Sequence, residues 1–132
     1  MTNGSAIQPA KILIIEDDKF ISRAYSDGIS RAGFQVTAVL DGVEALEKAR
    51  EVKPDLVLLD LILPGKNGFQ ILTEFKNDPE LKEIPVIVLS NLSQPSDIDK
   101  AKSLGAVDYL TKVNFSMKEV VEKLKSYLAT SP

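Results

Sequence analysis

The 132-residue sequence contains neither cysteine nor histidine. Without cysteine, the chain can form no disulfide, thiol nucleophile or thiolate metal site, and it fits a reducing compartment such as the cytoplasm. Without histidine, it can form no Ser-His-Asp or Cys-His triad, no imidazole zinc site and no phosphohistidine of its own. Metal binding by this chain would therefore depend on oxygen ligands.

Long apolar runs are also absent. No segment approaches the length of a membrane span, and the N-terminus has no signal-peptide core. The net charge of -3 argues against a nucleic-acid surface, and 44% hydrophobic with 27% charged residues is ordinary for a soluble globular protein. We expect a disordered N-terminal lead at 1–10, one domain at 11–129 and a tail at 130–132.

Apolar runs and amphipathic stretches alternate five times along the chain. The runs typical of strands are Lys11–Ile15, Gln35–Leu40, Leu56–Leu59, Pro85–Leu89 and Val107–Leu110. The stretches typical of helices are Lys19–Ala32, Val43–Val52, Phe69–Lys76, Ser93 or Ser96 to Leu104, and Ser116 to about Ala129. This pattern predicts an α/β fold with a doubly wound, five-stranded parallel sheet. The second run is less apolar and is placed at the edge, which predicts the strand order 2-1-3-4-5.

Finer predictions concern the helix faces and helix starts. The predicted inner stripe of the first helix is Ile21, Ala24, Gly28 and Ala32. The predicted buried side of the second helix is Val43, Ala45, Leu46 and Ala49. Either Ser93 or Ser96 is expected to cap the fourth helix. Ser116 and Glu119 have the spacing of a capping box at the start of the last helix.

Polar side chains follow four of the five expected strands. They are Glu16, Asp17 and Asp18 after the first strand, Asp60 after the third, Ser90 and Asn91 after the fourth, and Thr111 and Lys112 after the fifth. In open parallel sheets, ligands bind at this carboxyl edge. Carboxylates that lie a few ångströms apart repel one another, and a divalent cation relieves the repulsion. Oxygen ligands alone favour Mg²⁺ or Mn²⁺ over zinc or copper.

An anion would complete such a site. Lys112 adds a positive charge and Ser90 adds a hydroxyl donor. An anion held between a metal, an ammonium, a hydroxyl and backbone N–H groups suits a phosphoryl group. Asp60, which follows the expected central strand, is then positioned as a nucleophile.

Taken together, these motifs resemble the receiver domain of two-component response regulators, from Lys11 to about Ala129. The matching segments are Ile-Leu-Ile-Ile-Glu-Asp-Asp at 12–18, Asp-Leu-Val-Leu-Leu-Asp at 55–60 with Leu-Pro-Gly-Lys-Asn-Gly after it, Ser90, and Gly-Ala-Val-Asp-Tyr-Leu-Thr-Lys at 105–112. The resemblance implies a flavodoxin-like receiver fold. It also implies a stand-alone cytoplasmic phosphorelay protein that accepts a phosphoryl group and is not an enzyme.

The same resemblance implies roles for the acids. Asp60 looks like the phospho-acceptor, which would receive the phosphoryl group from a sensor histidine kinase or a phosphotransfer protein. Asp17, Asp60 and the backbone carbonyl of Ile62 would bind Mg²⁺ or Mn²⁺. Glu16 would contribute through water.

Other residues would bind the phosphoryl group or respond to it. Lys112, Ser90 and Asn91 would bind the phosphoryl oxygens. Ser90 and Tyr109 would act as the switch and change the face made by the fourth helix, fifth strand and fifth helix. A downstream protein target would read that face, with the chain as a monomer or a phosphorylation-linked dimer.

Two positions depart from the family pattern. Asn91 stands where a small residue is usual, and Val113 stands where a proline in a cis peptide is usual. A cis bond before a non-proline residue costs about 2.5–4 kcal/mol, so we predict a trans Lys112–Val113 bond. Ile62 and Leu92 are apolar and cannot orient a water molecule, which predicts slow loss of the phosphoryl group.

Three other functions remain open from the residues alone. The chain could be a receiver-like interaction module that is never phosphorylated. It could be an aspartyl phosphatase, although Ile62 stands where such enzymes place a second acid. It could also carry a flavin or a nucleotide, although an acidic first loop would repel phosphate. Phe20 could belong to the core or could be an exposed docking residue.

Overall fold

A computed structural model describes residues 9–128 of the chain. Its strands are Lys11–Ile15 (β1), Gln35–Val39 (β2), Leu56–Leu59 (β3), Val86–Ser90 (β4) and Asp108–Thr111 (β5). Its α-helices are Lys19–Arg31 (α1), Gly42–Val52 (α2), Gly68–Asn77 (α3), Pro95–Ser103 (α4) and Met117–Leu128 (α5), and a short 3₁₀ turn, η2, spans Lys112–Asn114. Residues 1–8 of the predicted lead at 1–10, and the predicted tail at 130–132, lie outside the described residues.

All five strands are parallel, in the order β2-β1-β3-β4-β5. This confirms the predicted fold class and the edge position of the second strand. β3 lies at the centre of the sheet, and its four residues, Leu-Val-Leu-Leu, are all buried. An unbroken apolar strand of this kind requires cover on both faces, because consecutive side chains point to opposite sides of the sheet.

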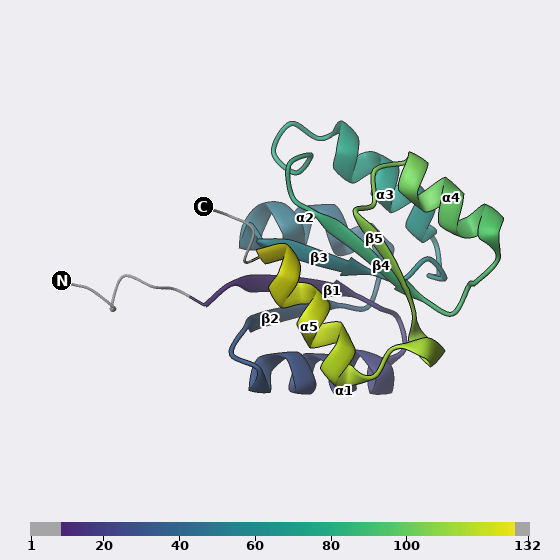
Figure 1. Ribbon diagram of the computed structural model, residues 1–132. Coiled ribbons are helices and arrows are strands. Elements are labelled where there is room, and N and C mark those ends of the chain that lie inside the picture. The colour runs from purple at the N-terminus through teal and green to yellow at the C-terminus, as the bar shows by residue number, and fades with distance from the viewer. Residues whose placement is uncertain (1–8, 129–132) are drawn as a thin grey trace.

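Helices supply that cover in two layers (Figure 1). α1 and α5 pack on one face, over strand residues such as Ile12, Ile14 and Leu58. α2, α3 and α4 pack on the other face, over Leu13, Leu59 and their neighbours. None of the helices within residues 9–128 has the length and hydropathy of a membrane-spanning segment.

The predicted inner stripe of α1 is wrong at Ala24, whereas its other members, Ile21, Gly28 and Ala32, are half-buried. Ser22 and Ile29 are buried and Tyr25 is half-buried, whereas Ala24 is exposed. The inner face is therefore displaced around the helix from the predicted one. Large Tyr and Ile side chains bury more area against the sheet than small Ala and Gly do, and this area outweighs a stripe of small residues.

The predicted inner side of α2 is wrong at one residue, Val43, whose side chain is 64% exposed. Gly42 is buried instead, and Ala45 and Ala49 are buried as predicted. A Cβ on Gly42 would lie 2.6 Å from Ile71 Cδ1 and 2.7 Å from the Lys66 carbonyl oxygen. Because α2 begins with a glycine in close contact with this chain segment, Val43 is turned outward.

The predicted cap of α4 is also wrong. Gln94 occupies the N-cap position without a side-chain hydrogen bond, and Pro95 begins the helix. Proline suits the first helical position because it has no N–H to satisfy and its φ is already helical. At α5 the predicted capping box is confirmed, with the Ser116 N–H donating to Glu119 Oε1 and the Glu119 N–H donating to Ser116 Oγ.

Gly68 begins α3 against the backbone that follows β3, and replacing it with alanine should be destabilising. A Cβ there would lie 2.5 Å from the Asp60 carbonyl oxygen and 2.5 Å from Leu61 Cα. Backbone atoms cannot rotate away, so we expect Gly68→Ala to lower the free energy of unfolding by about 1–3 kcal/mol. Urea unfolding measures this loss, and an unchanged midpoint would contradict it.

Gly33→Ala is a useful comparison for that variant. Gly33 has a φ of 104° and nothing within 4 Å of a built Cβ. Its replacement should cost about 1–3 kcal/mol from backbone strain alone. Only the Gly68 variant should also disturb the position of Asp60.

Candidate acidic site at the carboxyl edge of the sheet

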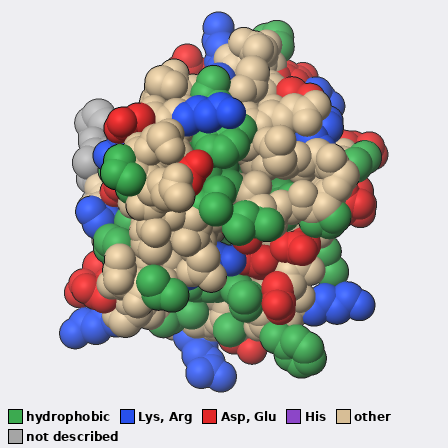
Figure 2. All heavy atoms as spheres, turned by 90° about the vertical axis from the view of Figure 1, so that its right-hand side faces the viewer, with side chains coloured by type: hydrophobic (Ala, Val, Ile, Leu, Met, Phe, Trp, Pro, Cys, Tyr) green, Lys and Arg blue, Asp and Glu red, His purple; other side chains and the backbone are tan. Residues whose placement is uncertain are grey.

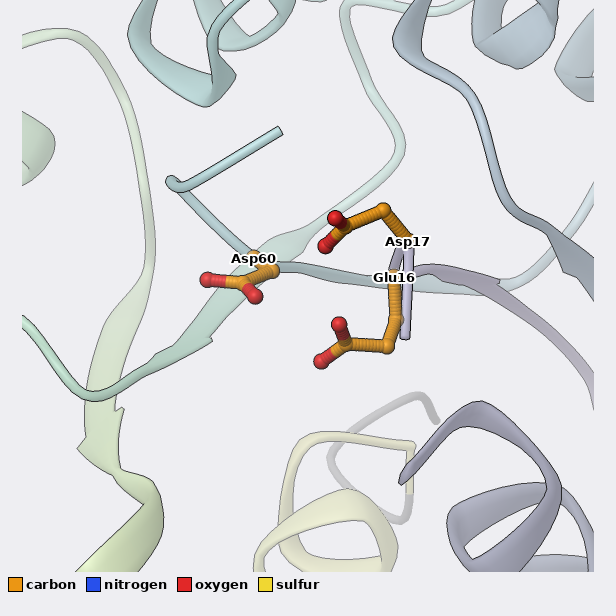
Figure 3. A group of neighbouring side chains, drawn as sticks. All are labelled: Glu16, Asp17 and Asp60. Carbon is orange, nitrogen blue, oxygen red and sulfur yellow. The ribbon is translucent and has the colours of Figure 1, made fainter. Parts of the chain in front are cut away.

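Strand register brings the predicted acids together. Ile15, the last residue of β1, pairs with Leu59, the last residue of β3. Glu16 and Asp60, which follow them directly, therefore lie side by side. The backbone confirms this alignment, because the Asp60 N–H donates to the Ile15 carbonyl oxygen at 3.0 Å. Figure 3 shows Glu16, Asp17 and Asp60 directing their carboxylates toward a common region. One carboxylate oxygen from each of the three residues lies within 4.8 Å of the other two.

Lys112 lies in the same cluster. Its Nζ donates to Glu16 Oε1 and, at 3.0 Å, to Asp60 Oδ2. The three side chains are 5–10% exposed, so the ion pairs are largely shielded from water. Figure 2 shows the face that bears the cluster, where acidic side chains gather near the middle with apolar side chains around them.

Backbone N–H groups hold two of the acids in place. The Asp18 N–H donates to Glu16 Oε2 at 3.0 Å, and the Ile62 N–H donates to Asp60 Oδ1 at 3.2 Å. Asp18 itself accepts from the Phe20 and Ile21 N–H groups and is therefore the N-cap of α1. The buried carboxylates thus have partners for both oxygens, which offsets much of the cost of their burial.

Burial affects the pKa values of this cluster. Burial raises the pKa of the Glu16 carboxyl, and the charge of Asp60 adds to this, although hydrogen bonds from Lys112 and the Asp18 N–H oppose it. Burial by itself would lower the pKa of Lys112, but its hydrogen bond to Glu16 and the charge of Asp60 raise the pKa overall. Lys112 is therefore charged at neutral pH.

The cluster fits a divalent cation by its donor chemistry. Glu16, Asp17 and Asp60 offer only carboxylate oxygens, the ligands that hard divalent cations prefer. One ammonium cannot balance three ionised carboxylates, so the site carries excess negative charge that a cation would offset. Asp17 is exposed, which gives a cation a route from solvent.

The other predicted site residues lie on the same edge. Ser90 ends β4, is fully buried and accepts a weak hydrogen bond from the Leu92 N–H at 3.4 Å. Asn91 is exposed. Tyr109 on β5 is 8% exposed, and its hydroxyl donates to the Leu92 carbonyl oxygen at 2.6 Å. Tyr109 therefore already points inward and is attached to the β4–α4 loop.

Two predictions about flanking residues are resolved. No cis peptide bond occurs within residues 9–128, so the trans Lys112–Val113 bond is confirmed. Phe20 and Val113 are strongly exposed, so Phe20 is not a core residue. Ile62 also exposes its side chain on this face, and its carbonyl as a metal ligand stays a prediction.

One residue near the cluster was missed in the sequence. Tyr25 on α1 lines a small cavity together with Glu16 and Asp60. The spacing of Ser22, Tyr25 and Ile29, three and four residues apart, was the available signal for a helix face that includes it. The prediction instead followed the stripe of mostly small residues on a neighbouring face of the helix.

Comparisons with known proteins agree with this geometry. Residues 12–125 match the family described as the response regulator receiver domain. The polar-differentiation response regulator DivK of Brucella anthropi is 33% identical over 120 residues, which cover 91% of this chain and 97% of DivK.

Two solved structures are also similar. The phosphorylated cyanobacterial phytochrome response regulator RcpA is 34% identical to this chain, with a TM-score of 0.84. The match covers 95% of this chain and 98% of RcpA. The Mn²⁺-bound form of the response regulator Rcp1 is 30% identical, with a TM-score of 0.79, and the match covers 94% of this chain and 97% of Rcp1. The sequence match, the strand order and the acidic cluster agree, and the chain belongs to the family of response regulator receiver domains.

Proposed function

We propose that this receiver domain accepts a phosphoryl group on Asp60 from a phosphohistidine of a sensor histidine kinase or a phosphotransfer protein. The observation that carries the proposal is the meeting of Asp60 with Glu16, Asp17 and Lys112 at the carboxyl edge of the sheet. The phosphorylated form in which RcpA was solved supports it.

In the proposed reaction, a carboxylate oxygen of Asp60 attacks phosphorus. The new P–O bond forms as the P–N bond to the histidine breaks, and the imidazole nitrogen keeps the bonding electron pair. Lys112, now paired with Asp60 Oδ2 at 3.0 Å, would pair with a phosphoryl oxygen and stabilise its charge. The transferred phosphoryl group stays on the chain, which fits a signalling domain.

Asp17, Asp60 and the Ile62 carbonyl would hold Mg²⁺ or Mn²⁺, with Glu16 contributing through water. A cation bound there would neutralise part of the negative charge that the carboxylates and the phosphoryl group bring together. The three converging carboxylates and the Mn²⁺-bound form of Rcp1 support this assignment.

We infer that Ser90 and Asn91 bind the phosphoryl oxygens and that Tyr109 reports the change. Ser90 is next to the β4–α4 loop that Tyr109 holds through the Leu92 carbonyl. A phosphoryl group replaces one carboxylate charge with about -1.5 to -2, which can bias a loop between two arrangements. The readout would be the α4–β5–α5 face, which a downstream protein would bind.

The exposed apolar residues on this face suit a protein donor. Phe20 lies in the first turn of α1, after β1, and Val113 lies in the 3₁₀ turn η2, after β5; both are strongly exposed. Apolar side chains that are exposed around a polar centre are typical of protein-binding surfaces. This supports a protein as the phosphoryl donor.

A direct test needs no cognate kinase. The protein is incubated with acetyl phosphate and Mg²⁺, and the intact mass is measured at intervals. We expect the mass of one added phosphoryl group, formed only when the divalent cation is present. No adduct would overturn the proposal and would leave the interaction-module function.

The phosphoryl group should be lost slowly, because the exposed side chain beside Asp60 is Ile62. An isoleucine cannot hydrogen-bond a water molecule for attack on phosphorus. Replacing it with asparagine should shorten the lifetime of the phosphorylated form by about tenfold, the effect of one hydrogen bond of about 1.4 kcal/mol on the barrier. Intact mass after removal of acetyl phosphate measures the lifetime. Ile62→Val is the matched control, and loss within seconds from the parent protein would contradict the expectation.

A further inference from the structure

A small cavity lies beneath the acidic cluster, between α1 and the carboxyl ends of β1, β3 and β4. Its volume is about 10 Å³, and its polar lining residues are Glu16, Asp60 and Tyr25. Four apolar side chains complete the wall: Ile14, Ile15, Leu58 and Leu89. This volume is close to the smallest that accommodates one water molecule, and the polar lining provides hydrogen-bond partners for it.

The hydroxyl end of Tyr25 lies near the charged groups. Burial raises the pKa of Tyr25, and the charges that act on its hydroxyl are those of Lys112, Glu16 and Asp60. Within residues 9–128, no protein group makes a direct hydrogen bond with this hydroxyl. A half-buried phenol in an apolar wall gains from a partner, and the other polar side chains that line this cavity are the carboxylates of Glu16 and Asp60.

We propose that Tyr25 is a positioning residue of the phospho-acceptor site, holding the carboxylates of Glu16 and Asp60 through one water molecule in this cavity. The inference rests on the proposed function for its consequence in phosphoryl transfer. The hydroxyl donates to the water, and the water donates to the two carboxylates.

The contacts already present leave room for this bridge. Glu16 uses Oε1 for Lys112 and Oε2 for the Asp18 N–H, and Asp60 uses Oδ1 for the Ile62 N–H and Oδ2 for Lys112. Each carboxylate oxygen accepts more than one hydrogen bond, so every one of these contacts can remain.

The bridge would contribute by holding the carboxylates of Glu16 and Asp60 in position. Carboxylates held in one arrangement bind a cation without first losing rotamer freedom, whereas unbridged ones lose it on binding. Tyr25→Phe removes only the hydroxyl and keeps the ring in its apolar contacts. We expect it to weaken Mn²⁺ binding about three- to tenfold, the loss expected for one hydrogen bond of typical net strength. Phosphorylation by acetyl phosphate should slow by a similar factor at limiting cation.

The measurement is the Mn²⁺ dissociation constant from water-proton relaxation, with the thermal midpoint recorded for every variant. Tyr25→Leu removes both the hydroxyl and the ring and should bind Mn²⁺ as weakly as Tyr25→Phe. Tyr127→Phe is the matched control, because that hydroxyl bonds the Val107 carbonyl and Asp108 at the other end of β5. It should leave Mn²⁺ binding unchanged.

Each outcome has a distinct meaning. If Tyr25→Phe binds Mn²⁺ as the parent protein does and only Tyr25→Leu is impaired, Tyr25 is a packing residue and the inference is overturned. If the parent protein binds no Mn²⁺, the inference is overturned as well. If Tyr25→Phe weakens Mn²⁺ binding but the parent takes no phosphoryl group, the proposed function fails while the positioning role stands.

Discussion

Asp60→Asn should abolish phosphorylation by acetyl phosphate. An amide oxygen is a poor nucleophile because its lone pair is delocalised, so the covalent step has no acceptor. The loss should be complete within detection and larger than that of any other single substitution. Intact mass spectrometry after incubation with acetyl phosphate and Mg²⁺ measures it.

Asp18→Asn is the matched control for this variant. It makes the same change of charge and side chain two residues from Glu16, and asparagine can still cap α1. It should be phosphorylated at the parent rate. A full phosphoryl adduct on Asp60→Asn would place the acceptor elsewhere and would contradict the assignment.

Lys112→Met should cause the largest loss of stability at neutral pH. The ammonium is the cation that pairs with both Glu16 and Asp60, and all three side chains are almost fully buried. Its removal leaves two adjacent buried carboxylates, and breaking a buried ion pair from one side costs about 3–5 kcal/mol. Urea unfolding in the presence of a chelator measures the difference. Lys118→Met, at an exposed lysine of α5, should change stability by no more than about 0.5 kcal/mol.

The sign of the pH dependence follows from Glu16. Its pKa is raised in the folded state, so its contribution to stability is fully present below the unfolded value of 4.5 and is lost as pH rises through the folded pKa. Without Lys112 this pKa should rise further. The loss in free energy of unfolding caused by Lys112→Met should therefore be largest at neutral pH. It should become smaller on acidification, as Glu16 takes a proton.

A divalent cation should reduce the same deficit. Mg²⁺ bound at the proposed site would supply positive charge to the carboxylates of the folded state, so adding it should raise the unfolding midpoint of the variant. A deficit that is independent of both pH and Mg²⁺ would mean that Lys112 contributes by packing and not by charge.

Which parts of the site could be predicted depended on the range of the forces involved. The acids were found because each directly follows an apolar strand, and parallel strands bring their carboxyl ends to one edge. Lys112 was found for the same reason, since it follows β5. These are local patterns, and the register of β1 with β3 then leaves little freedom in where Glu16 and Asp60 meet.

The predictions that were wrong concern features that tertiary packing determines. The inner face of α1 could not be predicted from a stripe of small residues, because Tyr25 and Ile29 bury more area than Ala24 does. Val43 is exposed because Gly42 lies against the Lys66 backbone, a contact between residues far apart in the chain. Pro95 decides the start of α4, although the serines beside it are good capping residues.

The sequence by itself determined the parallel α/β sheet, the strand order and the set of acids at its carboxyl edge. It could do so because hydrophobic periodicity and strand-end polarity act over a few residues. Only the tertiary structure decided that Lys112 pairs with two buried carboxylates, that Tyr109 points inward and that Tyr25 reaches the cavity beneath them. Those arrangements depend on how complete helices pack against the sheet, because side-chain burial is settled by contacts between distant segments.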